Sequence, residues 1–156
     1  ETATRRFAFE AFLPMDKKER KEVLEELVNE TRTIILYEAP HKLVRTLRDL
    51  RETLGNRRMT LCRELTKKHE TAFHSTIDDL ITHYEKEKPL GECVLVIEGK
   101  SRQELKEEAV ASWEEISIEE HMEIYEKKGM SRKDAMKQVA KDRGVSKRDI
   151  YSYLMK

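Results

Sequence analysis

The sequence has 156 residues, enough for one ordinary domain with a small additional unit. Hydrophobic residues make up 38% of it and can form a core, whereas 40% charged residues favour long solvated helices and 6% aromatic residues argue against extensive base-stacking surfaces. The 31 basic and 31 acidic residues cancel, no apolar run approaches the roughly 20 residues of a membrane-spanning helix, and the start at Glu1 resembles no signal peptide.

The first hundred residues alternate between predicted strands and predicted helices. Phe7, Phe9 and Phe12 predict a strand that ends at Pro14. Short apolar runs predict four more strands, at 33–37, 59–62, 71–74 and 92–97. Helices are predicted at 16–29, at 40–54 and, from a capping box that begins with Ser75, at 75–86. This alternation predicts an α/β fold with a roughly five-stranded sheet, which the short link between the third and fourth strands allows to be mixed.

Beyond Gly99 the sequence carries helix signals and no strand signal. A serine followed three residues later by an acidic residue marks four helix starts, at 101–104, 117–120, 131–134 and 146–149. Gly129 and Gly144 separate the last three predicted helices, and the last two resemble a helix-turn-helix unit. We therefore expect an α/β domain at 1–100 and a helical linker with a basic helix-turn-helix-like tail at 101–156.

The charges are distributed unevenly along this helical part. Residues 127–156 hold ten Lys or Arg and three Asp or Glu, whereas residues 101–126 hold two and nine. A basic stripe on a small helical unit is typical of nucleic-acid binding, although a solvated helix face beside an acidic neighbour would give the same pattern. The candidate RNA contacts in the tail are Lys133, Lys137, Lys147 and Arg148.

Two cysteines lie in predicted strands. Neither Cys62 nor Cys93 has a second cysteine or a histidine at the spacing of a zinc site. We therefore expect two reduced core thiols in a cytoplasmic protein and no metal site.

Three segments place polar residues directly after an apolar strand, at 37–42, 63–70 and 98–100. In sheets with helical crossovers, ligands gather outside strand ends because the loops there converge, so three agreeing strand ends indicate a common site. Tyr37 could offer a flat apolar face and a hydroxyl group. Glu38 could accept a hydrogen bond from a ribose or an amine, or could serve only as a carboxylate near a helix start.

Further polar residues of these segments have alternative roles. His41 could be a general base, a phosphate contact or a polar histidine of a first helical turn. Arg63 and Lys67 could bind a phosphate backbone or belong to an ordinary basic surface, and Thr66 could bind a ligand or cap a turn. The five glycines form no loop that would cradle a cofactor. The residues by themselves thus indicate an α/β domain with a basic helical tail.

Several strings together resemble one family. They are RFAFEAFLP at 6–14, TIILYEAPHKL at 33–43, RELTKKHET at 63–71, GECVLVIEGK at 91–100 and the tail from residue 130. They resemble the small-subunit ribosomal RNA ribose methyltransferase I family, within the tetrapyrrole methylase superfamily. The resemblance implies two α/β domains with S-adenosylmethionine in the cleft between them. It also implies methyl transfer to the 2′-hydroxyl of a decoding-centre cytidine in small ribosomal subunits, and a homodimeric full-length protein.

The resemblance also implies roles for residues of the strand ends. Tyr37, Glu38, Ala39, Leu65 and Thr66 would face the cofactor. His41, Arg63, Glu64 and Lys67 would line the RNA side, and Glu64 or Lys67 would help to remove the proton of the ribose hydroxyl, unless the base belongs to the first domain.

The glycine-rich cofactor loops of the first domain are missing from this sequence. Together with a start at Glu1 rather than Met, this predicts a carboxy-terminal fragment that is inactive alone, with most of the cofactor bound by the first domain. Two other interpretations stay open. The second domain of a corrin or porphyrin methylase would not need the basic tail, and a non-enzymatic nucleic-acid-binding module would not need the polar strand ends.

Overall fold

The computed structural model describes residues 2–156, whose contacts divide the chain into two compact units. Unit 1 ends at Ser101, and unit 2 covers Arg102–Lys156. Among the described residues, no helix is both long enough and apolar enough to cross a membrane.

Unit 1 contains the predicted mixed sheet. Its five strands are β1 (Phe7–Phe12), β2 (Thr33–Glu38), β3 (Arg58–Arg63), β4 (Thr71–Thr76) and β5 (Cys93–Ile97). They lie in the order β1-β2-β5-β3-β4. The β1–β2 pair is parallel, and the other three pairs are antiparallel. The predicted fold class is confirmed, and the antiparallel β3–β4 pair is the one that the short link allowed.

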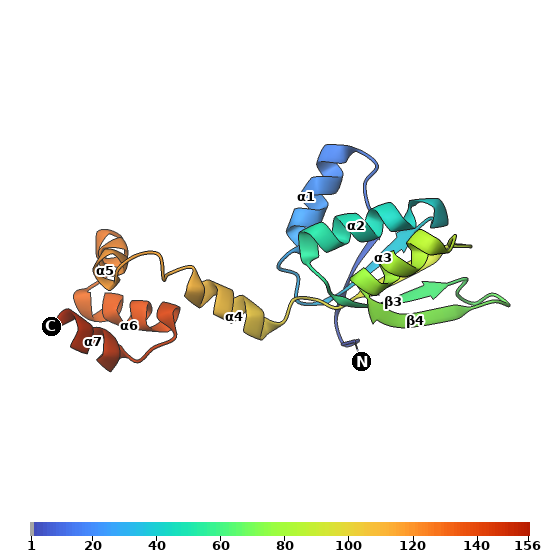
Figure 1. Ribbon diagram of the computed structural model, residues 1–156. Helices are drawn as coiled ribbons and strands as arrows, with labels where there is room; N and C mark the ends of the chain where they lie inside the picture. The colour runs from blue at the N-terminus through green and yellow to red at the C-terminus, as the bar shows by residue number, and fades with distance from the viewer. Residues whose placement is uncertain (1) are drawn as a thin grey trace. The chain divides into compact units, whose positions relative to one another are not determined.

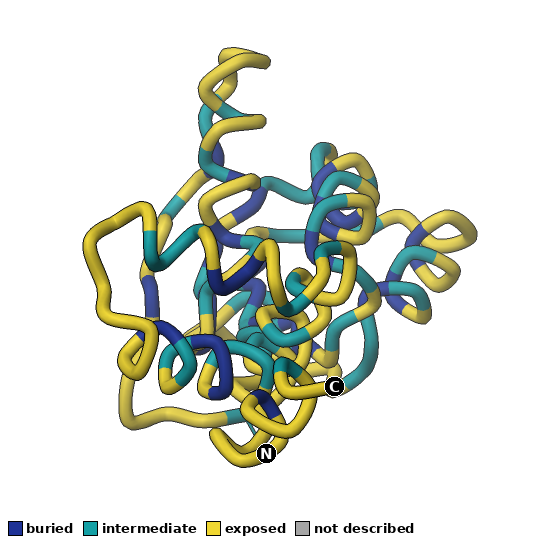
Figure 2. Tube along the Cα trace, turned by 90° about the vertical axis from the view of Figure 1, so that its left-hand side faces the viewer, coloured by how far each residue is buried: buried dark blue, intermediate teal, exposed yellow. Residues whose placement is uncertain are grey.

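Three helices pack on one face of this sheet (Figure 1). They are α1 (Lys17–Leu27), α2 (Leu43–Leu54) and α3 (Ile77–Lys86). The largest buried side chains of the sheet, which include Ile34, Leu36 and Leu95, pack against α2 residues such as Leu47. Figure 2 shows the buried segments in dark blue. The hydrophobic positions of the predicted strands and helices thus come together in this core.

Two predicted helix starts are shifted. The chain at Pro40 first forms a single 3-10 turn (η1, Pro40–Lys42), and α2 begins only at Leu43. The residue before a proline is restricted to extended backbone, as Ala39 is, so no helical turn starts before Pro40. Thr76, not Ser75, caps α3, because β4 extends to Thr76 and the Thr76 side chain accepts from the Asp79 N–H.

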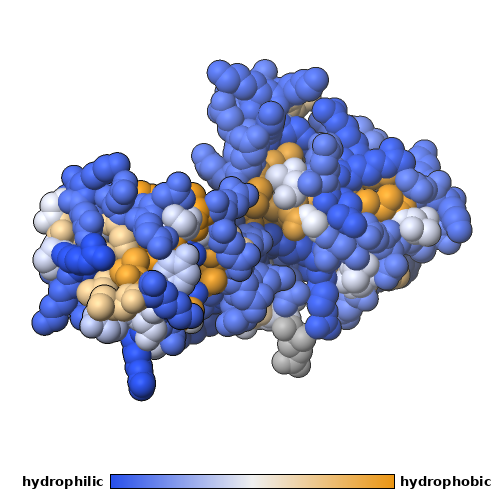
Figure 3. Space-filling view, turned by 60° about the vertical axis from the view of Figure 1, so that its left-hand side comes forward, coloured by the Kyte–Doolittle hydropathy of each residue, from blue (hydrophilic) through white to orange (hydrophobic). Residues whose placement is uncertain are grey.

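The phenylalanines of β1 lie on the face of the sheet opposite the helices. Phe7, Phe9 and Phe12 are 54%, 53% and 60% exposed, whereas Ala8 between them is buried. A bulge between Phe9 and Ala11 shifts the register, so Phe9 opposes Ile35 and Phe12 opposes Tyr37. Figure 3 shows one side of the molecule, where hydrophobic side chains emerge in patches between predominantly hydrophilic ones.

Unit 2 is built from α4 (Arg102–Ala111), α5 (Ile118–Lys127), α6 (Arg132–Arg143) and α7 (Lys147–Leu154). Ser117, Ser131 and Ser146 cap the last three helices, as predicted. A second small core joins these helices, formed by Met122, Ala135, Val139, Ala140 and Ile150.

A buried polar network, which the sequence did not reveal, lies in unit 2 around His121. The His121 imidazole is fully buried and stacks on Trp113, with 3.8 Å between the ring centroids. Its Nε2 lies 3.1 Å from Asp142 Oδ2, and its Nδ1 accepts a hydrogen bond of 3.0 Å from Arg143 Nε. Tyr125 also donates to Asp142. Because Arg143 is a donor, this arrangement requires a neutral imidazole with its proton on Nε2.

We expect unit 2 to lose stability as the pH falls. Burial lowers the pKa of His121 more than the hydrogen bond with Asp142 raises it. The unfolded chain therefore takes up a proton first, near the ordinary value of about 6.5, and the free energy of unfolding decreases from about pH 7.5 towards pH 5. The fluorescence of Trp113, the single tryptophan of the sequence, reports this transition during thermal unfolding.

The matched control is His69→Gln, because His69 is exposed and lies in unit 1. This variant should show the same fall in the Trp113 transition midpoint as the unchanged chain. A midpoint that is the same at pH 7.5 and pH 5.5 would show that His121 does not couple protonation to folding.

Candidate functional site

One edge of the sheet in unit 1 collects the polar segments that follow β2 and β3. Glu38 and Arg63 both oppose Cys93, because β5 lies antiparallel between β2 and β3. β1 runs parallel to β2 and ends at the same edge, with Phe12 opposite Tyr37. We call this region, formed by residues 12–15, 37–42, 63–66 and 91–93, the carboxyl edge.

The third predicted segment, 98–100, does not belong to the carboxyl edge. It follows β5, which runs opposite to β2 and β3, so it emerges at the other end of the sheet. There the N–H of Glu98 donates to the Arg58 carbonyl, at the start of β3. The expectation that all three strand ends converge is therefore wrong for this segment, because β5 is antiparallel.

Unusual backbone conformations occur at the carboxyl edge, at Glu64 and Thr66, and directly before it, at Ala11. In the described part of the chain, the non-glycine residues with positive φ are Ala11, Glu64 and Thr66, at 50°, 51° and 63°. Such conformations cost free energy and concentrate at functional sites. None of these residues is a glycine or an asparagine, the residue types that most often adopt a positive φ, so the sequence did not predict these conformations.

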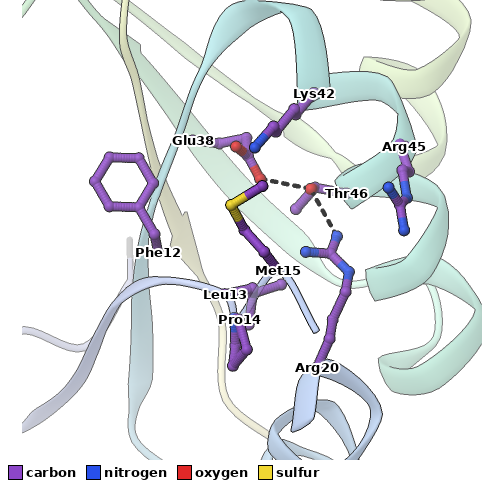
Figure 4. A pocket seen from close by; sticks show the side chains of 9 residues that line it. All are labelled: Phe12, Leu13, Pro14, Met15, Arg20, Glu38, Lys42, Arg45 and Thr46. Atoms are coloured by element: carbon purple, nitrogen blue, oxygen red, sulfur yellow. Dashed lines mark hydrogen bonds between the residues drawn. The ribbon is translucent and has the colours of Figure 1, made fainter. Parts of the chain in front are cut away.

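A cavity of about 210 Å³ opens at the carboxyl edge between β1, β2 and α2 (Figure 4). It is lined by Phe12, Leu13, Pro14, Met15, Arg20, Glu38, Lys42, Arg45 and Thr46. Lys42 and Arg45, two of the lining residues, form no ion pair with another described residue.

Glu38 forms a wall of this cavity and is only 5% exposed. Its Oε1 accepts from the Ala39 N–H at 2.8 Å, and its Oε2 accepts from the Thr46 hydroxyl at 2.6 Å. Thr46 in turn accepts from Arg20, which also pairs with Asp49 at 2.9 Å. Of the two roles open to Glu38, the geometry supports the carboxylate that ties the end of β2 to the following helix.

The other predicted cofactor residues are more accessible. Tyr37 is 40% exposed, on the face opposite the helices, and its ring contacts Phe9 and Phe12 edge-on at 5.2 and 5.7 Å between centroids. Leu65 and Thr66 are exposed in the loop between β3 and β4, where the Thr66 N–H donates to Glu70. Ala39 is half-buried before η1.

Glu64 and Lys67 form a pair within the same loop. Lys67 Nζ lies 3.2 Å from Glu64 Oε2, and the Glu92 N–H donates to Glu64 Oε1 at 3.1 Å. The hydrogen bond from Lys67 is the main cause that lowers the pKa of Glu64. A carboxylate with a lowered pKa is a weaker proton acceptor, so Glu64 suits a positioning role better than that of a general base.

The predicted RNA-side residues fall into different surroundings. His41 is exposed on η1, whereas Arg63 is half-buried and donates from Nε to the Leu90 carbonyl at 2.7 Å. Arg63 therefore braces the loop before β5. The tail residues Lys133, Lys137, Lys147 and Arg148 are exposed and belong to unit 2.

Both cysteines are free thiols. Burial raises the pKa of Cys93 to about 11, and burial is also the main cause that raises the pKa of the half-buried Cys62. Neither thiol has the lowered pKa of a reactive cysteine. Cys93 lies in the core, as predicted, whereas Cys62 is only half-buried.

Residues 2–81 match the family model described as Tetrapyrrole (Corrin/Porphyrin) Methylases. The chain belongs to this family. The proteins named Ribosomal RNA small subunit methyltransferase I of Halalkalibacterium halodurans and Bacillus subtilis are each 43% identical to it, over 96% and 93% of this chain and 51% and 49% of their own length. The protein of that name from Synechocystis is 38% identical over 96% of this chain and 52% of its own length.

These relatives confirm the predicted membership in the small-subunit ribosomal RNA methyltransferase I group of the tetrapyrrole methylases. The chain spans about half the length of the curated relatives that it matches.

We expect Gly91→Ala to disturb Glu64. Gly91 has φ of 76°, and a Cβ built there would overlap the Glu64 carboxylate. Backbone strain should lower the free energy of unfolding by about 1–3 kcal/mol. The total loss should be larger, because Glu64 must also leave its position beside Glu92. Urea unfolding followed by circular dichroism measures the loss.

Glu64→Ala provides the matched background for this test. Without the carboxylate, only the backbone strain of Gly91→Ala remains, so the loss should be smaller than in the unchanged chain. Equal losses in the two backgrounds would show that Gly91 does not make room for Glu64.

Proposed function

We propose that this chain is the carboxy-terminal part of an S-adenosylmethionine-dependent methyltransferase that methylates the 2′-hydroxyl of a cytidine in small-subunit ribosomal RNA. The observation that carries this proposal is the 43% identity, over 96% of the chain, to a Ribosomal RNA small subunit methyltransferase I. The accessible, strained carboxyl edge in unit 1 and the basic surface of unit 2 support it.

The residues of the carboxyl edge fit S-adenosylmethionine in part. Tyr37 and Leu65 expose apolar surface that suits an adenosyl group, and the exposed Thr66 adds a hydroxyl group. Each Glu38 carboxylate oxygen already accepts one hydrogen bond, from the Ala39 N–H or from the Thr46 hydroxyl, which ties Glu38 to the end of β2 and to α2. We therefore propose that Tyr37, Leu65 and Thr66 contact the cofactor, with Ala39 beside them, and that Glu38 holds the end of β2 in place.

When bound, S-adenosylmethionine supplies a methyl group that its sulfonium activates for transfer. The task of the protein is then to position the ribose oxygen and to accept its proton. In our proposal Lys67 lies on the RNA side, held by Glu64, while His41 contacts the substrate from η1. The hydrogen bond from Lys67 lowers the pKa of Glu64, so in our proposal Glu64 holds Lys67 in position.

Deletion of the full-length parent gene should remove one ribose methyl group from small-subunit ribosomal RNA. Mass spectrometry of nuclease fragments would show a cytidine-containing fragment that is lighter by one methyl group, and the intact gene on a plasmid should restore the mass. Unchanged ribosomal RNA in the deletion strain would overturn the proposal and would favour a methylase of small tetrapyrroles.

The chain of 156 residues alone should release little heat when titrated with S-adenosylmethionine, because it spans about half of its relatives' length. Isothermal titration calorimetry measures this, with the full-length protein as the positive control. Tight binding to the chain alone would show that unit 1 carries more of the cofactor site than we propose.

A further inference from the structure

Helix α7 is held in a defined orientation at the end of unit 2. At its start, Ser146 Oγ accepts from the Asp149 N–H at 3.1 Å, and Asp149 Oδ2 accepts from the Ser146 N–H at 2.9 Å. Ile150 is buried in the small core, and Leu154, one turn later, packs against the same core. The rotation of the helix is therefore fixed, and Arg148 and Tyr151 are held at its surface.

Tyr151 differs from other aromatic residues of unit 2. Trp113 and Tyr125 lie against His121, and Tyr125 also donates to Asp142. Tyr151 is 54% exposed and, within the described residues, has no ring contact and no hydrogen bond from its hydroxyl group. A single exposed tyrosine is ordinary on a protein surface, so its neighbours decide what it can do.

Two cations lie about one helical turn before Tyr151. Lys147 lies four residues before it and Arg148 three, which places all three side chains on neighbouring positions of one helical surface. Both cations are exposed, and neither forms an ion pair or a hydrogen bond with a described residue. In contrast, Lys127 pairs with Glu123 at 3.2 Å and Arg132 pairs with Glu126 at 3.4 Å.

We propose that this surface, formed by Lys147, Arg148 and Tyr151, binds an unpaired region of RNA. The two cations contact successive phosphates, and the Tyr151 ring stacks on one unstacked base between them. The inference rests on the proposed function, which makes ribosomal RNA the partner of the tail. It adds that the tail recognises the face of a base in addition to phosphate charge. An acidic protein surface would provide the charge but no base.

The composition of the chain is consistent with this limited mode of stacking. With 6% aromatic residues the chain cannot build a broad stacking platform, whereas one ring beside two cations is sufficient for one base. A base inside a continuous duplex offers no free face, so the surface should prefer a loop, a bulge or a strand end.

Fluorescence anisotropy with the chain of 156 residues tests the proposal on two RNA probes. One probe is a hairpin with an unpaired loop, and the other is a blunt duplex with the same number of phosphates. Tyr151→Ala should weaken binding of the hairpin roughly 5- to 100-fold and leave binding of the duplex nearly unchanged. Tyr151→Phe keeps the ring and should bind the hairpin as the unchanged chain does.

Two further variants separate stacking from charge. Tyr153→Ala is the matched control, because Tyr153 is 46% exposed but lies two residues along the helix, on another side. It should not alter either affinity. Lys147→Gln and Arg148→Gln should weaken both probes and lower the slope of log affinity against log salt by about 0.7 to 0.9 for each cation removed.

The outcomes distinguish this inference from the proposed function. If Tyr151→Ala binds the hairpin as tightly as the unchanged chain, base stacking is overturned while RNA binding by the tail stands. If the unchanged chain binds neither probe, the RNA surface on α7 is overturned, and the loss of the ribose methyl group in the deletion strain still decides the proposed function. Trp113 fluorescence verifies that each variant retains the fold of unit 2.

Discussion

The insertion of β5 between β2 and β3 is the constraint on which the candidate site depends. Because β5 is antiparallel to both neighbours, Cys93 opposes Glu38 on one side and Arg63 on the other. Two strand spacings then separate the ends of β2 and β3, roughly 10 Å. The loops that follow these ends share one edge, although about 25 residues of sequence separate them, and the segment before β5 contacts the second loop through Arg63 and Glu64.

A buried carboxylate keeps the first of these loops in place. Removing Glu38 from water is costly unless its oxygens are hydrogen-bonded, and the Ala39 N–H and the Thr46 hydroxyl meet that need. Arg20 extends the network to α1 and brings a charge that Asp49 balances. These hydrogen bonds join β2, α2 and α1 beside the cavity. They hold in place the elements that carry the cavity-lining side chains.

The sequence predicted correctly those features that depend on residues close together in the chain. It did not predict features that depend on how distant strands pair in the sheet. The caps at Ser117, Ser131 and Ser146 depend on residues three positions apart, and the sequence displays them directly. The direction of β5 depends on its two neighbours in the sheet, so the segment at 98–100 was assigned to the wrong edge. Glu64 has a positive φ, and its carboxylate lies beside Gly91, which is 27 residues away, so no local sequence signal connects the two residues.

The basic tail shows why the sequence alone could not identify which of its cations form the RNA-binding surface that we propose. Its three acidic residues hold the helix starts at Ser131 and Ser146 and the network around His121, which leaves them engaged inside unit 2. Arg143 donates to His121 and to the Ile116 carbonyl, so its charge serves the same core. Of the ten basic residues at 127–156, Arg143 is therefore the one whose charge serves the core, and the other nine are exposed. Within that set, Lys147 and Arg148 stand beside an exposed aromatic ring, and this combination, more than the net charge, points to a nucleic acid with an accessible base.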